Sequence, residues 1–226
     1  MTQYGSEIPN AVISPDVLLE EIAKAEGLIP DIDDKPIVTK PVNSEPITQS
    51  NPTKTLNSND KTKEYTFNSF VIGDNNSFAY NAALAVAKNP GHAYNPLLIY
   101  GGVGLGKTHL MCAIGHHCLS DNSKKVIYVT AEDFTNEFIE SVGAKTTQKF
   151  KNKYRNADVL LIDDIHFFQN KAGSQEELFH TFNALYDSFK QIVFTCDRPV
   201  SELVNLADRL RSRFGRGLNV DLSLPS

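Results

Sequence analysis

The fold of this chain follows from one stretch, GGVGLGKT at residues 101–108. The stretch fits the pattern G-x-x-x-x-G-K-[ST], and it lies between an apolar run at 97–100 and a segment with helical character. Glycines let a backbone wrap closely around phosphate groups with its N–H groups pointing inward. The stretch therefore predicts a phosphate-binding loop between a buried strand and the first turn of a helix.

Each residue type in this loop has a chemical role. We expect Gly101, Gly104 and Gly106 to let the backbone approach a nucleoside triphosphate. Lys107 is expected to reach the β- and γ-phosphates, and the hydroxyl of Thr108 to ligate Mg²⁺. An ordinary glycine-rich turn is the other interpretation, but it explains neither the Lys-Thr pair nor the flanking strand and helix.

A triphosphate site of this kind needs an acidic residue to hold the metal, and a second apolar run supplies one. Residues 159–162 end in Asp163 and Asp164. Ligands bind at the carboxyl edge of an open α/β sheet, so both side chains are expected near the loop. We expect Asp163 to hold Mg²⁺ and Asp164 to orient the attacking water. Acids at a solvated strand end are the alternative.

Two further candidates lie downstream. Thr195 or Asp197, at the end of the apolar run 192–195, could sense the γ-phosphate or only cap the strand. Four arginines then fall between 209 and 216. They form either a solvated face or an arginine offered to the γ-phosphate of a neighbouring subunit.

Apolar runs alternate with helical segments along most of the chain, which indicates a parallel sheet covered on both faces. We therefore predict a three-layer α/β fold of the P-loop NTPase type. The expected strands are 97–100, 125–130, 159–162, 192–195 and 218–222. The expected helices are 77–88, the loop to 119, 131–142, 146–155 and 174–190, with short helices in 201–212.

Composition divides the chain near residue 64. Residues 1–64 carry 11 acidic and 6 basic side chains and the rest carries 16 of each, so the net charge of −5 comes from the first part. We expect 1–64 to be an acidic, linker-like arm and 65–226 an α/β domain. A tether at 27–63 is expected to be disordered, because polar residues and prolines dominate it. A short helix over 14–25 or a frayed arm would precede it.

Several protein classes are excluded. No apolar run approaches the length of a membrane span, and residues 1–30 lack the basic start and apolar stretch of a secretory signal. Three cysteines, Cys112, Cys118 and Cys196, are too few for a disulfide framework. We therefore expect a reducing, cytoplasmic location. The balanced charge of 65–226 means that any nucleic-acid contact must come from local basic patches.

Several longer motifs together resemble the DnaA family of bacterial replication initiators. They are YNPLLIYGGVGLGKTHL at 94–110, DDIHFF at 163–168, SQEE at 174–177, HTFN at 180–183 and RLRSRF at 209–214. Generic phosphate-loop ATPases do not share the set. The resemblance implies an AAA+ ATPase core that binds ATP or ADP with Mg²⁺.

The resemblance also assigns roles to individual residues. Phe67 begins a segment similar to the one that packs against adenine in the family. Asp163 matches the Mg²⁺ acid, and Asp164 stands where other AAA+ proteins have glutamate, as it does in the DnaA family. Asp197 matches the first sensor. Arg213 matches the arginine finger, which acts in trans when ATP-bound subunits assemble into a helical filament.

The segment 131–155 resembles the insertion with which the family holds and stretches single-stranded DNA. Ile139 and Lys171 match positions associated with that contact, while Gly173 stands where the family often has a basic residue. The composition of this segment partly supports a DNA-binding role, because a basic cluster with interleaved aromatics suits contact with a nucleic-acid backbone. The cluster comprises Lys145, Lys149, Lys151, Lys153 and Arg155 with Phe150 and Tyr154. A solvated helix face is the alternative.

The family comparison also concerns partners. A helical lid and a domain for duplex DNA would follow Ser226, so we expect a fragment or truncated product with weakened nucleotide affinity and no specific origin binding of its own. The expected partners are origin DNA, a second copy or a full-length initiator through Arg213, and helicase or regulators through the arm. The alternatives are a binding-only regulator of the full-length initiator and an ATPase of the helicase-loader type.

Two lesser patterns are interpreted as packing. Cys112 and His116 stand one helical turn apart and could share a metal, but no further ligands are evident in the sequence. An aromatic and aliphatic series recurs at helical spacing and is expected to lie in the core. It comprises Phe179, Phe182, Leu185, Tyr186 and Phe189.

Overall fold

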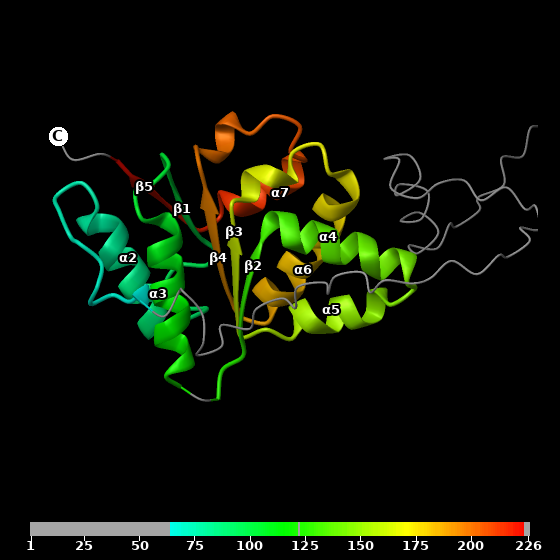
Figure 1. The fold of residues 1–226 in the computed structure, drawn as a ribbon, viewed down its shortest axis with the longest axis horizontal. Helices are drawn as coiled ribbons and strands as arrows, with labels where there is room; N and C mark the ends of the chain where they lie inside the picture. Colours follow the sequence, from blue (N-terminus) through cyan, green and yellow to red (C-terminus); the bar gives the residue numbers. More distant parts are fainter. Residues whose placement is uncertain (1–63, 122, 224–226) are drawn as a thin grey trace, which may run out of the picture. The chain divides into compact units, whose positions relative to one another are not determined.

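The computed structural model describes residues 64–121 and 123–223, and its centre is a five-stranded parallel sheet (Figure 1). The strand order is β2-β3-β4-β1-β5, and every neighbouring pair is parallel. The strands are β1 (Leu97–Gly101), β2 (Val126–Thr130), β3 (Val159–Asp163), β4 (Gln191–Cys196) and β5 (Leu218–Leu222). The predicted α/β class is confirmed, because all five expected strands are present and parallel.

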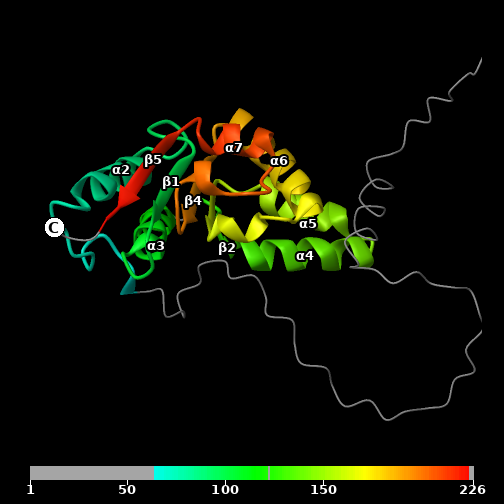
Figure 2. The same cartoon turned by 90° about the horizontal axis from the view of Figure 1, so that it is seen from above.

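Helices cover the sheet on two sides. α2 (Ser77–Lys88) and α3 (Lys107–Leu119) pack on one face. The other face carries α4 (Ala131–Gly143), α5 (Thr147–Arg155) and α6 (Ala172–Asp187), with α7 (Asp208–Phe214) packed on α6 (Figure 2). Two short 3-10 helices, η2 (Ile165–Phe168) and η3 (Val200–Glu202), follow β3 and β4. The layers are therefore helix, sheet and helix.

The central strands are apolar because both of their faces are buried. β3 and β4 are buried at every position, whereas the edge strand β5 alternates. On the α2–α3 side the core includes Leu97, Leu161 and Val193. Within the described residues, no helix combines the length and the apolar character that crossing a bilayer requires.

The aromatic series on α6 is only partly a core. Phe182 and Leu185 are buried as predicted, but Phe189 is 68% exposed and the core placement predicted for it is wrong. The reason is the helix end: α6 stops at Asp187, and Phe189 adopts a left-handed φ of 55° beyond it. α6 also begins at Ala172, two residues before the predicted start.

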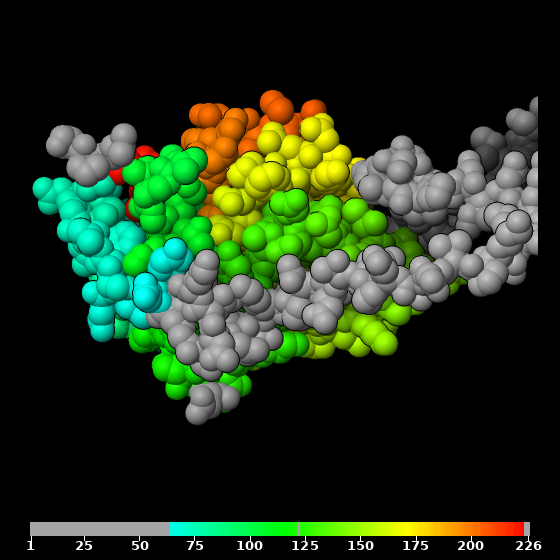
Figure 3. All heavy atoms as spheres, viewed as in Figure 1, coloured from blue at the N-terminus to red at the C-terminus, as the bar shows by residue number. Residues whose placement is uncertain are grey.

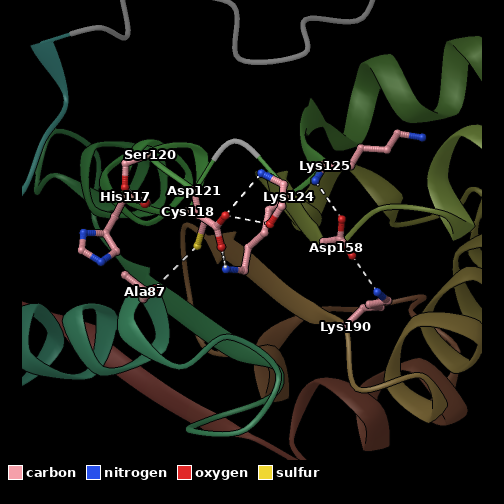
Figure 4. A network of polar contacts seen from close by, with 10 residues as sticks. Ala87, His117, Cys118, Ser120, Asp121, Lys124, Lys125, Asp158 and Lys190 are labelled. Atoms are coloured by element: carbon pink, nitrogen blue, oxygen red, sulfur yellow. Dashed lines mark hydrogen bonds and ion pairs between the residues drawn. The ribbon is translucent and has the colours of Figure 1, made fainter.

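Asp158 joins the starts of three adjacent strands at the edge opposite the glycine-rich loop (Figure 4). It accepts hydrogen bonds from the backbone N–H of Lys125 at 2.8 Å, just before β2, and from Nζ of Lys190 at 2.6 Å, just before β4. Burial acts to raise the pKa of Asp158, but these bonds and the charge of Lys190 outweigh it and lower the pKa. The carboxylate therefore stabilises the sheet in its ionised form.

Some predictions concern residues that the structure does not describe, and one concerns the segment after β4. The arm at 1–64, the helix at 14–25 and the tether at 27–63 lie outside the described residues, apart from Glu64. In 201–212, where short helices are expected, the structure has the end of η3, a loop and the start of α7. Arg211 holds this loop, because its guanidinium donates to the carbonyls of Val200 and Leu203.

Candidate nucleotide-binding site

The glycine-rich loop joins β1 to α3, as the sequence predicts. Gly106 precedes the first turn of α3 with a φ of +95°, a conformation that side chains rarely adopt. A Cβ there would also lie 2.8 Å from the ring of Phe70. The helix begins at Lys107, so the unpaired N–H groups of its first turn face the loop. This arrangement suits the binding of an anion at a helix N-terminus.

Lys107 lies inside the curve of the loop. Its side chain is 8% exposed, and Nζ donates a hydrogen bond to the carbonyl of Gly102 at 2.7 Å. A hollow of about 290 Å³ adjoins it. The hollow is lined by Tyr65, Gly104, Gly106, Lys107, Thr108 and His109. Lys107 therefore borders a hollow that is also lined by Gly104 and Gly106 of the loop and by the first turn of α3.

Thr108 and Asp163 meet across the junction of α3 and β3. The Thr108 hydroxyl donates to Oδ2 of Asp163 at 2.9 Å, and Asp163 is 3% exposed. Tyr128 on β2 donates to the same oxygen at 3.0 Å, and Thr195 on β4 donates to Oδ1. A hydroxyl and a carboxylate are the hard oxygen donors that Mg²⁺ prefers, so the residues present fit this ion.

Asp164 follows directly and faces a different environment. It is half-buried and has a left-handed φ of 58°, and its backbone N–H donates to Oγ1 of Thr195 at 2.8 Å. Burial raises the pKa of its carboxyl, and the charge of Asp163 raises it further. A carboxylate with a raised pKa accepts a proton more readily. The Asp164 carboxylate is therefore chemically suited to polarising a water.

Asp197 and Thr195, the two candidate sensors, differ in their contacts. Asp197 accepts two hydrogen bonds from Arg198, at 2.9 and 2.7 Å, which lower its pKa despite opposing burial. Thr195 is fully buried between Asp163 and the backbone of Asp164. Thr195 thus fixes the two acids, and the half-buried Asp197 is the one available to a ligand.

The aromatic residues near the loop differ from the expectation. Phe67 packs edge-on against Tyr80 and His117, on α2 and α3, and it does not line the hollow beside Lys107. Tyr65 does line that hollow, stacked on His109 with ring centroids 4.9 Å apart. The sequence did not predict these contacts: Tyr65 lies in none of the motifs, and His109 lies in the motif at 94–110 without an assigned role. Tyr128 was not predicted either, because its contact depends on strand pairing. The role of Phe67 stays a prediction.

Arg213 is held by α6. Its Nε donates to Oδ1 of Asn183 at 2.7 Å, and its guanidinium lies 4.0 Å from the ring centroid of Phe179. Arg209 lies over the same ring at 4.6 Å and pairs with Glu176. Burial lowers the pKa of Arg213, and so do the neighbouring charges of Arg216 and Arg209. The core placement predicted for Phe179 is wrong, because its half-buried ring carries these two cations instead.

The aromatics of the basic cluster point inward. Phe150 is 5% exposed and Tyr154 is fully buried, and both pack on Phe134 of α4. They are therefore not available to stack on bases, which corrects that part of the interpretation. Lys153 and Arg155 form ion pairs with Glu137 and Glu177.

The three candidate DNA contacts lie on or directly before three different helices. Ile139 is half-buried on α4, Lys149 is exposed on α5, and Lys171 is half-buried directly before α6. α4 packs against α5, η2 and α6, so it links these elements. Figure 3 shows the segments after β3 and β4, yellow and orange, side by side along the upper edge. Asn205 Nδ2 donates a hydrogen bond to Asn170 Oδ1 at 2.7 Å and links the two segments.

Comparison with known proteins places this geometry in a family. The profile of the bacterial DnaA ATPase domain matches residues 61–221. The chromosomal replication initiator protein DnaA of Treponema denticola is 68% identical over 163 residues, which are 72% of this chain and 35% of that protein. This chain thus spans about a third of the length of that curated relative.

Solved structures agree. Domain III of the Thermotoga maritima replication initiation protein DnaA is 51% identical with a TM-score of 0.71, over 73% of this chain and 69% of that one. A replication initiator DnaA bound to AMPPCP and single-stranded DNA is 40% identical with a TM-score of 0.70, over 72% of this chain and 51% of that one. The chain therefore belongs to the bacterial DnaA ATPase domain family.

Proposed function

We propose that this chain binds ATP or ADP with Mg²⁺ and, in its ATP-bound form, assembles with further copies on origin DNA to start chromosome replication. The observation that carries the proposal is the hydrogen bond between Thr108 and Asp163, which joins the glycine-rich loop to the acid at the end of β3. An initiator with 40% identity was solved with the ATP analogue AMPPCP, which supports a nucleotide here.

The loop residues would hold the triphosphate. Backbone N–H groups from Gly104 to Thr108 and the amine of Lys107 would bind the phosphates, with Gly101 setting the start of the loop. Mg²⁺ held by Thr108 and Asp163 would neutralise charge on the β- and γ-phosphates. Asp164 would orient the attacking water, and Asp197 would contact the γ-phosphate end of the nucleotide. The contacts of these side chains described above support the assignment.

Arg213 would act on the nucleotide of a neighbouring copy. Its guanidinium contacts Asn183 and Phe179 on α6, and the residue is half-buried. A fixed, weakly hydrated guanidinium suits the stabilisation of a phosphate in trans. The same contact would allow capture of a full-length initiator.

Single-stranded DNA would bind along α4, α5 and the start of α6. Lys149 would contribute charge and Ile139 apolar contact, with Lys171 at the neighbouring edge. An initiator of this family was solved with single-stranded DNA, which supports this class of partner. Residues 1–64 would remain an arm that offers a site to helicase or regulators.

Calorimetry with Mg-ATP tests the central claim. We expect wild-type chain to bind Mg-ATP more tightly than ATP in EDTA, and Lys107→Ala to lose binding in both conditions, because the phosphates lose their cation. Lys88→Ala, at an exposed lysine of α2, is the matched control and should bind as wild type. Unchanged affinity in Lys107→Ala would rule out the proposed site.

A turnover assay separates this function from a binding-only regulator. An ATPase rate that increases with protein concentration and single-stranded DNA favours the initiator core. Nucleotide binding without turnover, together with capture of a full-length initiator, favours the regulator instead.

A further inference from the structure

A second group of chemically reactive side chains lies beside the two acids. His166 on η2, Cys196 at the end of β4 and Asp197 each offer one ligand atom, and the three atoms lie within 4.8 Å of one another. His166 Nδ1 is 3.7 Å from Asp197 Oδ1, and Asp197 Oδ1 is 3.8 Å from Cys196 Sγ. The cluster joins two adjacent strands, because η2 directly follows β3 and β3 pairs with β4.

These separations match the edges of a small tetrahedron. Bonds of about 2.0–2.3 Å from zinc to nitrogen, oxygen and sulfur place neighbouring ligands roughly 3.3–3.8 Å apart. The separations of 3.7 Å between His166 and Asp197 and 3.8 Å between Asp197 and Cys196 lie at the upper end of this range. We propose that His166 Nδ1, Cys196 Sγ and Asp197 Oδ1 bind a divalent ion of the zinc class, with a fourth position open to water.

The imidazole provides an independent observation. His166 Nδ1 is buried and has no hydrogen-bond partner among the described residues. A buried polar atom without a partner costs free energy, so natural structures rarely keep one. Coordination of an ion would satisfy this nitrogen with the Asp197 carboxylate already facing it.

The three ligand atoms, one each of nitrogen, sulfur and oxygen, indicate which metal ion would bind. Thiolate and imidazole favour zinc and related transition ions, whereas Mg²⁺ prefers oxygen alone. The site therefore differs in chemistry from the pair Thr108 and Asp163. Burial raises the pKa of Cys196 to about 11, so the thiol carries its proton at neutral pH. When the metal–sulfur bond forms, that proton passes to the buffer.

Arg198 is compatible with the bound state. It donates from Nε to Oδ1 and from Nη2 to Oδ2 of Asp197, and its side chain is 49% exposed. When an ion occupies Oδ1, the bond to Oδ2 can remain and orient the carboxylate, as outer partners of metal ligands commonly do. If the proposed function holds, an ion here would engage the candidate sensor and slow nucleotide turnover.

Cobalt titration of the full chain under a non-thiol reductant tests the site. Tetrahedral Co²⁺ gives intense visible bands, and a cobalt–thiolate bond adds a charge-transfer band in the near ultraviolet. We expect both bands in wild-type protein, displacement of Co²⁺ by Zn²⁺, no charge-transfer band in Cys196→Ser, and at least about tenfold weaker binding in His166→Gln.

The other cysteines give matched controls. Cys118→Ser and Cys112→Ser should retain the band, and a band that disappears with Cys112 would overturn the proposal in favour of α3. Thermal melting checks that Cys196→Ser folds. If Cys196→Ser does not fold, the cobalt affinity of His166→Gln tests the site instead. Wild-type-like cobalt affinity in His166→Gln would also overturn the site. Lys107→Ala should keep the band, which separates this proposal from nucleotide binding.

Discussion

The hydroxyl of Thr108 donates a 2.9 Å hydrogen bond to Oδ2 of Asp163, although 55 positions separate the two residues. The sheet creates this contact, because β1 and β3 both end at the edge where α3 begins. Asp163 also accepts from Tyr128 and Thr195, so its carboxylate is oriented before any ligand arrives. Such orientation by surrounding donors is what a metal-binding acid requires.

Removing one member of this pair should abolish most of the Mg²⁺ dependence of ATP binding. We expect Thr108→Ala and Asp163→Asn each to weaken Mg-ATP binding about tenfold or more, since a hydrogen bond to a charged group contributes about 1.5–3 kcal/mol. Thr108→Ser, which keeps the hydroxyl, should remain close to wild type. In calorimetry the double variant should be less than additive, because both residues act on one ion.

The matched measurement is ATP binding in EDTA. There the Thr108 and Asp163 variants should differ little from wild type, because their proposed partner is absent. Equal losses with and without Mg²⁺ would show that the substitutions disturb the loop itself and not a metal site.

The contact between Thr108 and Asp163 could be predicted from the sequence because each residue belongs to a short, recognisable motif. The loop motif and the acidic end of an apolar strand can each be recognised in the sequence. In a parallel sheet both lie at the carboxyl edge, so they are expected to meet there. The contact of Tyr128 with Asp163 depends on the β2–β3 register, in which Thr130 pairs with Asp163, and no local pattern encodes it. Tyr65 was missed for a similar reason, since its stacking on His109 arises only in the folded chain.

The direction of side chains on helices is the other part that sequence left open. Alternating lysines and aromatics on α5 suit either a DNA-binding face or a helix packed on a neighbour. Packing on Phe134 buries Phe150 and Tyr154, because removing two large rings from water stabilises the fold more than exposing them would. Likewise, Phe189 follows the helical spacing but lies beyond the end of α6.

Arg213 should act in assembly and not in binding of nucleotide by its own subunit. We expect Arg213→Ala to keep the ATP affinity of the monomer within about twofold and to lose ATP-dependent assembly, since arginine fingers act on a neighbour's phosphates. Calorimetry on dilute protein and analytical ultracentrifugation with Mg-ATP measure the two properties. If the Arg213→Ala monomer lost its ATP affinity, Arg213 would instead act on the nucleotide bound by its own subunit.

Phe179 is expected to position Arg213 for that contact. Its ring lies under the guanidiniums of both Arg209 and Arg213. Phe179→Ala should weaken ATP-dependent assembly about two- to fivefold, since an exposed cation–π contact contributes about 0.5–1 kcal/mol. Phe179→Tyr should restore assembly. Phe189→Ala removes an exposed aromatic from the end of the same segment and should leave assembly unchanged.

Lys149 and Phe150 should separate DNA contact from folding. We expect Lys149→Ala to lower the slope of log affinity for single-stranded DNA against log salt by about 0.7, the value for one phosphate contact. Its unfolding free energy should stay within about 0.5 kcal/mol of wild type. Phe150→Ala should destabilise the chain by about 3 kcal/mol, because it leaves a cavity against Phe134. An unchanged salt slope in Lys149→Ala would remove this residue from the DNA interface.

Asp158 should make stability depend on pH. Its pKa is lowered in the folded chain, so its contribution is complete above the ordinary value of about 3.9 and is lost as the pH falls through the lower folded value. Asp158→Asn should therefore be less stable than wild type by roughly 1–2 kcal/mol at neutral pH, because the bonds to Lys125 and Lys190 weaken.

Urea denaturation across a pH series measures this difference. The two unfolding free energies should stay apart from neutral pH down to about pH 5 and converge below about pH 4, where the wild-type carboxyl takes up its proton. Asp74→Asn removes the same charge from an exposed loop and should match wild type throughout. A constant gap between wild type and Asp158→Asn at every pH would mean that amide geometry, and not the ionised carboxylate, holds the three strand starts together.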